Sequence, residues 1–142
     1  MKHPTPYIDR HLVLTNDIRQ VSLLTGFIME LATERELDRS LTLNLNLALE
    51  EAVVNVLMYA YPEGTTGLVE IHAVLSGNTL EFTLTDRGKP FDPTAAPETD
   101  ISVGLDARTG GGLGIHLVRT IMDHIEYTRE NGRNILKLTK NI

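Results

Sequence analysis

The order of periodic patterns along the sequence predicts an α+β fold, a two-layer α/β sandwich with helices on one face of a mixed or antiparallel sheet. Two long helical patterns come early in the chain, and alternating strand patterns come in pairs around short turns. Helices do not alternate with single strands, which argues against a doubly wound parallel sheet. With 142 residues, the chain is expected to form a single domain, residues 1–142, around one continuous core.

The composition excludes several classes of function. The chain has no cysteine, so neither a disulfide nor a thiolate zinc site can form. Its formal net charge of −6 disfavours nucleic-acid binding, because phosphate contacts need clustered Lys and Arg. No apolar run approaches the roughly 20 residues that span a bilayer, and the first residues lack the apolar stretch of a signal peptide. We therefore expect a cytoplasmic protein with no nucleic-acid and no membrane partner.

The amino-terminal part is expected to form a strand and a helix. The stretch "RHLVLT", residues 10–15, alternates as a short strand does. Thr15 or Asn16 can cap a helix that continues to about Glu34. The apolar stripe of this helix consists of Ile18, Val21, Leu24, Ile28 and Leu31. A polar connection follows, and Ser40 can cap the next helix.

The segment over residues 41–60 carries two conflicting periodicities. Its leucines at positions 41, 43, 45, 47 and 49 alternate as in a strand. A helical stripe is also present, made of Leu41, Leu45, Ala48, Ala52, Val53 and Val56. The segment is far longer than an average strand and is rich in Leu, Ala and Glu, which favour helix. We therefore predict a helix over residues 41–60, ended by "PEGTTG".

Two antiparallel hairpins and a third helix complete the predicted fold. The strands "LVEIHAVLS" and "TLEFTLTD" flank the turn "SGN", and "IEYTRE" and "RNILKLTK" flank "NG". Residues 86–112 show no periodicity, and a loop of this length is usually functional, often a lid. The helix "LGIHLVRTIMDHI" follows this loop. Its buried side is expected to consist of Ile115, Leu117, Val118, Ile121 and Met122.

The helix over residues 41–60 carries a polar pair in the apolar stretch "LEEAVVNVLMYAYP". Glu51 and Asn55 are spaced i,i+4, so their side chains lie one turn apart on the same face. Burying either polar group without a partner costs roughly 2–7 kcal/mol by transfer estimates. A ligand, the neighbouring backbone or water must therefore satisfy them.

Two further stretches have chemical meaning. In "TDRGKPFDP", Asp86 ends an apolar strand and Gly88 follows two residues later. An Asp can accept a hydrogen bond from an exocyclic amine, and Gly lets the backbone approach a flat ring, although Asp-x-Gly alone is also a common turn. In "TGGGLGIHL", glycines precede a helix whose free N–H groups and dipole suit phosphates. This cluster alone could equally be a hinge, and it lacks the Gly-Lys-Ser/Thr ending of a Walker A loop.

Together the three stretches resemble the ATP-binding domain of the GHKL superfamily, which DNA gyrase, heat-shock chaperones, sensor histidine kinases and mismatch-repair ATPases share. Within it, the helix "EAVVNVLMYAY" is most similar to the anti-sigma factor serine/threonine protein kinases of bacterial partner-switching systems. Tyr59 departs from their pattern, which usually has His at this position. The likeness extends from the first helix to the last hairpin. It implies the histidine kinase-like ATPase fold of the Bergerat type.

The resemblance implies a role for each residue of these stretches. Asn55 would ligate Mg²⁺ through its carboxamide oxygen, and Glu51 would be the general base for an attacking serine hydroxyl. Asp86, helped by Gly88, would bind the adenine amino group of ATP. The lid and its phosphate contacts would come from Gly110, Gly112, Leu113 and Gly114. Arg19 is the candidate for an arginine that contacts the γ-phosphate and the partner.

The resemblance implies an ATP-binding kinase that phosphorylates a serine of a small anti-sigma factor antagonist protein and sequesters a sigma factor. Retention of both Glu51 and Asn55 favours this enzyme over the alternative, a nucleotide-dependent regulatory binding module without significant phosphotransfer. The catalytic half of a sensor histidine kinase is disfavoured, because the chain leaves no room for dimerising phospho-acceptor helices. Family members often form homodimers. His72 and His116 have no paired ligand spacing and are expected to be surface residues.

Overall fold

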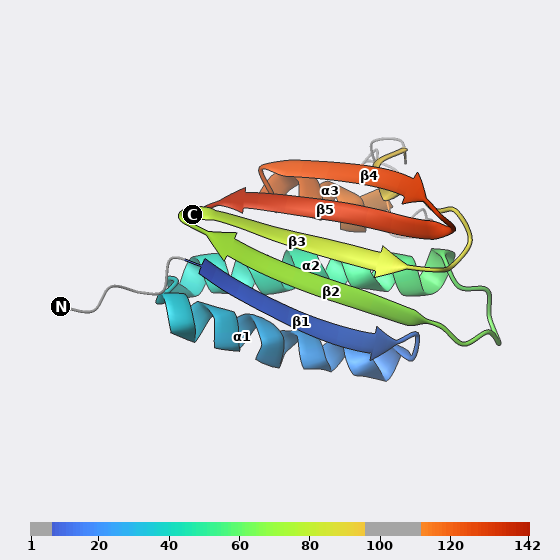
Figure 1. Ribbon diagram of the computed structural model, residues 1–142, viewed down its shortest axis with the longest axis horizontal. Coiled ribbons are helices and arrows are strands. Elements are labelled where there is room, and N and C mark those ends of the chain that lie inside the picture. The colour runs from blue at the N-terminus through green and yellow to red at the C-terminus, as the bar shows by residue number, and fades with distance from the viewer. Residues whose placement is uncertain (1–6, 96–111) are drawn as a thin grey trace.

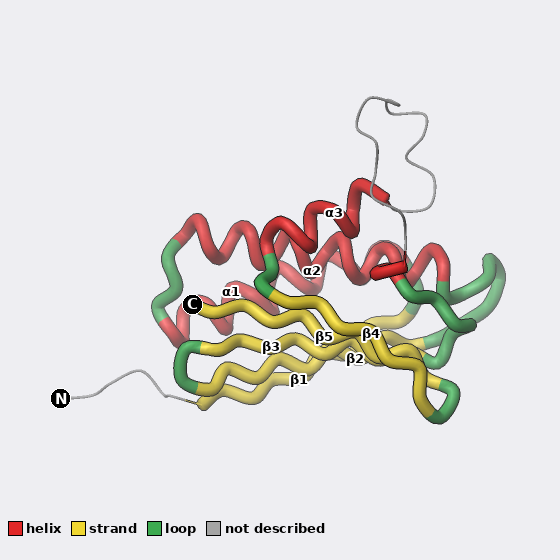
Figure 2. Tube along the Cα trace, turned by 90° about the horizontal axis from the view of Figure 1, so that it is seen from above, coloured by secondary structure: helices red, strands yellow, loops and turns green. Residues whose placement is uncertain are grey.

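The computed structural model of the protein describes residues 7–95 and 112–142. Over these ranges the chain forms a five-stranded antiparallel sheet with the helices in a single layer on one of its faces, which confirms the predicted α+β sandwich (Figures 1 and 2). The elements in chain order are β1 (Tyr7–Thr15), the 3-10 helix η1 (Ile18–Ser22), α1 (Leu23–Arg35), α2 (Arg39–Tyr59), β2 (Leu68–Ser76), β3 (Thr79–Asp86), the 3-10 turn η2 (Pro93–Ala95), α3 (Gly112–Ile121), β4 (His124–Glu130) and β5 (Arg133–Asn141).

The sheet order is β1-β2-β3-β5-β4, and each neighbouring pair is antiparallel. Both predicted hairpins are therefore present, and β1 begins earlier than predicted and pairs with β2. The end of β3 lies in the middle of the sheet, where the ladder places Asp86 between Val69 of β2 and Asn134 of β5. A polar side chain at this position points toward the helix layer and not into bulk solvent.

The core lies between the two layers. Alternate residues of β2, β3 and β5 face the helices, as the period of two in a strand requires. The buried apolar residues of these strands are Val69, Ile71, Ala73, Leu75, Leu80, Phe82, Leu84, Leu136 and Leu138. From α3, Ile115 and Val118 are buried as predicted, and so is Met122 directly after this helix, whereas Leu117 and Ile121 are half-buried. Removing this apolar surface from water is the main favourable term in folding.

Helix α2 runs through the middle of the helix layer, between α1 and α3 (Figure 1). Its helical stripe defines the core, since Leu45, Ala48 and Ala52 are buried while Leu43, which belongs only to the alternating pattern, is 58% exposed. Among the described residues, α2 is the one helix long and apolar enough to cross a membrane by length and composition. In this protein 50% of its most apolar window is buried against the rest of the fold, as in a core helix.

The first helix begins differently from the prediction. Asp17 caps η1 by accepting a hydrogen bond from the Arg19 N–H at 2.9 Å, so the predicted cap at Thr15 or Asn16 is wrong. The Asn16 side chain instead bonds across to the loop before β2. Ile18 was predicted to belong to the apolar stripe of the first helix, but it lies in this 3-10 turn and is exposed.

The other two helices also differ at one end. The Asp38 carboxylate accepts a hydrogen bond from the Leu41 N–H at 2.7 Å, so Asp38 and not Ser40 caps α2. Helix α3 stops at Ile121, short of its predicted end. The Asp123 N–H donates to a β5 carbonyl at 2.8 Å, and this bond turns the chain into β4.

Candidate functional site

Helix α2 positions the polar pair Glu51 and Asn55 one turn apart on one face. Asn55 is 5% exposed and Glu51 is half-buried, although their neighbours Ala52 and Val56 belong to the apolar core. The helix therefore holds a carboxylate and an amide oxygen together at the edge of the interior. Both are hard oxygen donors of the kind that Mg²⁺ prefers.

Asp86, at the end of β3, is a buried carboxylate with only 3% of its surface exposed. Its Oδ1 accepts hydrogen bonds from the Gly88 N–H and from Asn134 Nδ2, each at 2.9 Å. Over the described ranges, no hydrogen bond ends on its Oδ2. Burial raises the pKa of Asp86, while the bonds from Asn134 and Gly88 and the nearby charge of Arg129 act in the opposite direction. One carboxylate oxygen is therefore held in place, and the other can accept a bond from a ligand.

Asn134, on β5, is the residue that fixes Asp86. Its Nδ2 donates to Asp86 Oδ1 and to the Lys89 carbonyl at 2.8 Å. Its Oδ1 accepts from the Phe91 N–H at 3.2 Å and from the Tyr127 hydroxyl at 2.5 Å. All four hydrogen-bonding positions of the amide are thus occupied, which leaves it one orientation. Asn134 joins the loop that follows β3 to the last hairpin.

Sequence reasoning did not identify Asn134, although a pattern for it exists. Asn134, Leu136 and Leu138 are spaced by two, so they share one face of β5, and both leucines are buried. An asparagine in phase with core leucines requires buried hydrogen-bond partners. The sequence alone does not say that Asp86 is the partner, because that depends on the register of β3 with β5.

Gly88 makes a close backbone contact with the end of α2. A Cβ atom at Gly88 would lie 2.3 Å from the Ala60 carbonyl oxygen. The next residue, Lys89, donates its N–H to the same oxygen at 2.8 Å. On the other side, Arg129 Nη1 donates to the Gly88 carbonyl at 2.9 Å. In this structure Gly88 therefore allows the loop after β3 to approach the backbone at the end of α2 closely. The contact holds this loop against the helix.

The loop that follows β3 also contacts two helices, α2 and α3. Phe91 packs against Tyr59 of α2, with ring centroids 5.2 Å apart and a tilt of 34°. The Asp92 carboxylate accepts from the Thr94 N–H at 2.8 Å, and Arg119 of α3 donates to the Thr94 carbonyl at 2.6 Å. The structure thus brings α2, the loop after β3 and α3 together, and α3 lies along α2 in the helix layer (Figure 2).

Gly112, Leu113 and Gly114 are the first three residues of α3. Backbone N–H groups at the start of a helix have no partner within the helix and suit an anion. Gly110 lies outside the described residues, as does most of the predicted lid.

Arg19 lies in η1, just after β1. Its side chain is 87% exposed and pairs with Asp17, with Nη2 and Oδ2 2.6 Å apart. The hydrogen bonds from Arg19 lower the pKa of Asp17 to about 2. The strand register brings the end of β1 to the same end of the sheet as Asp86, two strands away. Arg19 therefore lies at the same end of the sheet as Asp86, and its side chain is paired with Asp17.

A pocket of about 320 Å³ lies where β2 begins and β3 ends, and Asp86 is part of its wall. Its lining consists of Tyr61, Thr66, Gly67, Leu68, Glu70, Thr85, Asp86, Arg87 and Arg133. Neither Glu51 nor Asn55 lines this pocket. It is therefore distinct from the face of α2 that carries the polar pair.

Comparison with known proteins gives a consistent set of relatives. A family model described as "Histidine kinase-like ATPase domain" matches residues 14–140. The serine-protein kinase RsbW of Halalkalibacterium halodurans is 35% identical over 101 residues, which cover 68% of this chain and 60% of that protein. The serine/threonine-protein kinase BtrW of Bordetella bronchiseptica is 29% identical over 99 residues, which cover 70% of each chain.

The fold also has a counterpart among solved structures. The crystal structure of the RsbU and RsbW domains of Rv1364c from Mycobacterium tuberculosis superposes with a TM-score of 0.67 at 18% identity. The match covers 94% of this chain and 32% of that one. At this identity the likeness shows the fold alone. The chain thus spans a part of several relatives, including 60% of the length of the Halalkalibacterium protein.

Proposed function

The chain belongs to the histidine kinase-like ATPase domain family, and from this we propose that it is an ATP-dependent protein serine/threonine kinase. Relatives at 29% and 35% identity bear the names of protein kinases for serine or threonine. The observation that carries the proposal is the buried Asp86, which Asn134 fixes beneath the helix layer with one oxygen unbonded by any described residue. The half-buried Glu51 on α2 supplies a carboxylate for the chemistry.

Asp86 would recognise the adenine base. Its Oδ1 is occupied by Asn134 and Gly88, so Oδ2 would accept a hydrogen bond from the 6-amino group of ATP. A buried acceptor left without its donor costs about 1–3 kcal/mol, so a base with a carbonyl at this position is penalised. Adenine would therefore be selected over guanine.

Asn55 and Glu51 would serve the phosphoryl transfer. The buried amide of Asn55 fits Mg²⁺ as an oxygen ligand. When bound, Mg²⁺ neutralises charge on the phosphates. Glu51 would accept the proton of the partner's serine hydroxyl while that oxygen bonds to the γ-phosphorus and the bond from this phosphorus to the β–γ bridging oxygen breaks. The products are ADP, a phosphoserine and a protonated Glu51 carboxyl.

The phosphates would bind at the start of α3. Backbone N–H groups of Gly112, Leu113 and Gly114, together with Gly110 before them, would donate to the phosphate oxygens. Arg19 would contact the γ-phosphate or the partner after its ion pair with Asp17 opens. Both charges of this pair are exposed, and water screens their attraction, so the pair opens readily.

We propose a small anti-sigma factor antagonist protein as the phospho-acceptor and a sigma factor as a second partner, in the cytoplasm. These partners come from the resemblance to anti-sigma factor kinases and from the kinase names of the relatives. A homodimer is proposed on the same resemblance. Light scattering on the purified protein measures its oligomeric state.

Affinity purification from the native cell, followed by phosphosite mapping of the co-purifying proteins, tests the function. The purified partner is then incubated with the protein and ATP labelled at the γ-phosphate. Label on a partner serine that requires Mg²⁺ is the expected result. A partner that binds in an ATP-dependent manner and never acquires label identifies a regulatory binding module and contradicts the kinase.

A further inference from the structure

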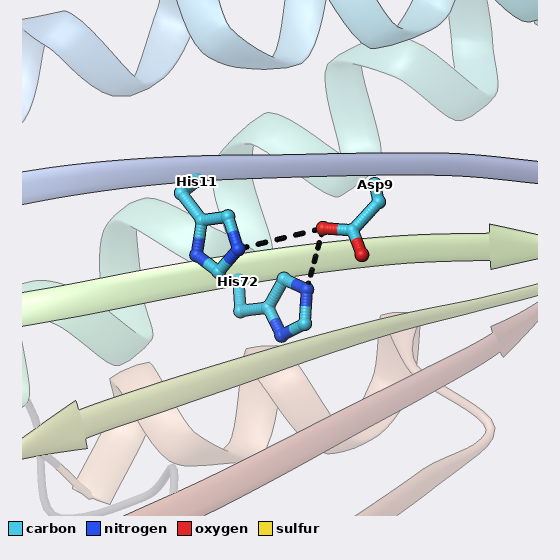
Figure 3. A group of neighbouring side chains, drawn as sticks. All are labelled: Asp9, His11 and His72. Atoms are coloured by element: carbon cyan, nitrogen blue, oxygen red, sulfur yellow. Dashed lines mark hydrogen bonds and ion pairs between the residues drawn. The ribbon is translucent and has the colours of Figure 1, made fainter.

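A cluster of two imidazoles and one carboxylate lies on the open face of the sheet, opposite the helix layer. Asp9 and His11 come from β1 and His72 from β2 (Figure 3). His11 and His72 are direct partners in the β1–β2 ladder, and their rings stack with centroids 4.1 Å apart. Asp9 Oδ1 lies 2.7 Å from His72 Nε2 and 3.5 Å from His11 Nε2. One potential ligand atom from each residue thus lies within 4.8 Å of the others.

We propose that Asp9, His11 and His72 form a binding site for a divalent transition-metal ion of the zinc class. Zinc bonds to imidazole nitrogen and carboxylate oxygen are about 2.0–2.2 Å long, so neighbouring ligand atoms of a tetrahedral site lie about 3.3 Å apart. Two of the present separations, 2.7 Å and 3.5 Å between Asp9 Oδ1 and the two Nε2 atoms, lie on either side of this spacing. Nitrogen-rich ligand sets favour Zn²⁺ and Co²⁺ over Mg²⁺ and Ca²⁺. Three protein ligands leave a fourth position for water.

The surroundings favour a cation at this point. The neighbours on the same face of the ladder are Tyr7, Val13, Glu70, Val74 and Thr83, and none of these carries a positive charge. Lys137 of β5 lies on this face one strand further away, beyond Thr83. Arg10, the cation next to Asp9 in the chain, points to the other face and pairs with Glu34 of α1. A metal at the cluster therefore meets no opposing charge from its ladder neighbours.

The ligands are partly held in place before any ion binds. Tyr7 donates a hydrogen bond to Asp9 Oδ2 at 3.3 Å, which orients the carboxylate so that Oδ1 faces both rings. Such support from outside the ligand set commonly contributes 10–100-fold to metal affinity. The two histidines are fixed relative to each other by the backbone pairing of β1 with β2.

Metal binding at this cluster would connect an edge strand to the rest of the sheet. β1 is the edge strand next to β2, and the ligands come from both strands. Because the complete ligand set exists only when β1 is paired, binding is linked to folding and stabilises that edge. The cluster is on the opposite face of the sheet from Asn55 and Asp86, so this site is independent of the nucleotide site.

The test is a Zn²⁺ and Co²⁺ titration of the full untagged chain carrying His3→Asn, which removes the imidazole closest to the amino terminus. Calorimetry measures the affinity for Zn²⁺, and the ligand-field absorption of Co²⁺ reports nitrogen ligands. We expect one bound ion per chain, a higher Tm with Zn²⁺, and no rise in Tm with the same concentration of Mg²⁺. His11→Gln and His72→Gln should each weaken Zn²⁺ binding by at least about tenfold, and Asp9→Asn should weaken it too.

His124→Gln is the matched control, because His124 is exposed on the opposite edge strand of the same sheet. This variant should bind Zn²⁺ as the parent does. The rise in Tm on adding Zn²⁺ is compared within each variant, so a variant that is less stable without metal is still informative. No binding by the parent, unchanged affinity in His11→Gln and His72→Gln, or an equal loss in His124→Gln would each overturn the proposal.

Discussion

Asp86 and Asn134 lie directly opposite each other in the β3–β5 ladder, and the Asn134 amide donates a hydrogen bond of 2.9 Å to Asp86 Oδ1. Both side chains are buried. A carboxylate at this depth is unfavourable without such partners. The pair therefore determines which oxygen of Asp86 remains available, and it connects the nucleotide site proposed here to the stability of the sheet.

Asn134→Ala should lower the free energy of unfolding by about 1–3 kcal/mol, because Asp86, the Lys89 carbonyl and the Tyr127 hydroxyl lose a buried partner. ATP affinity should fall as well, since Asp86 is no longer held. Urea unfolding and calorimetry measure the two effects. Asn141→Ala, at the exposed end of the same strand, is the control and should change neither. Equal stability of the two variants would contradict the role given to Asn134.

Asp86→Asn should weaken ATP binding at least about tenfold while leaving the fold intact. The new amide can keep its oxygen toward the donors Asn134 and Gly88, and this places its NH₂ group where Oδ2 was. Two donors then face each other when adenine binds. Calorimetry gives the affinity, and circular dichroism verifies folding. Wild-type ATP affinity in a folded variant removes Asp86 from adenine recognition.

Nucleotide binding should require Mg²⁺ and should favour ATP over GTP. Guanine presents a carbonyl where adenine presents an amino group, so the free oxygen of Asp86 would meet another acceptor. Titrations with each nucleotide, with Mg²⁺ and with EDTA, measure both dependences. If ATP and GTP bind equally well, the selectivity assigned to Asp86 is wrong.

Gly88→Ala and Gly26→Ala should change stability in opposite directions. At Gly88 the added Cβ would lie 2.3 Å from the Ala60 carbonyl oxygen, so the free energy of unfolding should fall by about 1–3 kcal/mol. At Gly26, inside α1, nothing lies within 4 Å of the added atom. Alanine there should raise the free energy of unfolding by about 0.5–1 kcal/mol through helix propensity. Urea unfolding of the two variants measures both changes. A Gly88→Ala protein that is more stable than the wild type would contradict the close contact.

Most secondary-structure elements could be predicted because their patterns are local. The helix over residues 41–60 was ambiguous at its start, and the structure explains the choice. Leu43 and Leu47 are exposed while Leu45 and Leu49 are buried, so the side of α2 that faces the sheet follows the helical period. Both helix caps were misassigned because several polar residues compete there. Which one caps depends on tertiary bonds such as those of Asn16 to the loop before β2.

The candidate site could be predicted only in part, because some of its residues are defined by pairing across the sheet. Glu51, Asn55 and Asp86 lie in recognisable local motifs. Asn134 comes next to Asp86 only when β5 pairs with β3. The same holds on the open face, where Asp9 and His72 meet from 63 residues apart in the chain. His72 was expected to be a surface residue without paired ligands, and no spacing in the sequence could indicate its contact with Asp9.

Glu51 and Glu50 provide the sharpest comparison for catalysis, since they are adjacent, half-buried carboxylates on α2. Only Glu51 is one turn from Asn55. Glu51→Gln keeps the shape of the side chain and removes its ability to accept a proton at neutral pH. ATP with Mg²⁺ should still bind, because Asn55 and Asp86 remain. Glu50→Gln is the matched control and should leave both binding and phosphotransfer unchanged.

The most direct measurement is therefore the single-turnover rate of phosphotransfer from ATP to the partner's serine by the wild type, Glu51→Gln and Glu50→Gln. Nucleotide affinity is measured in parallel. The expected result is a rate about 10²–10⁴-fold lower for Glu51→Gln alone, the range typical for losing a positioned base, with nearly wild-type ATP affinity. A folded Glu51→Gln protein that phosphorylates its partner at the wild-type rate would contradict the assignment of Glu51 as the general base.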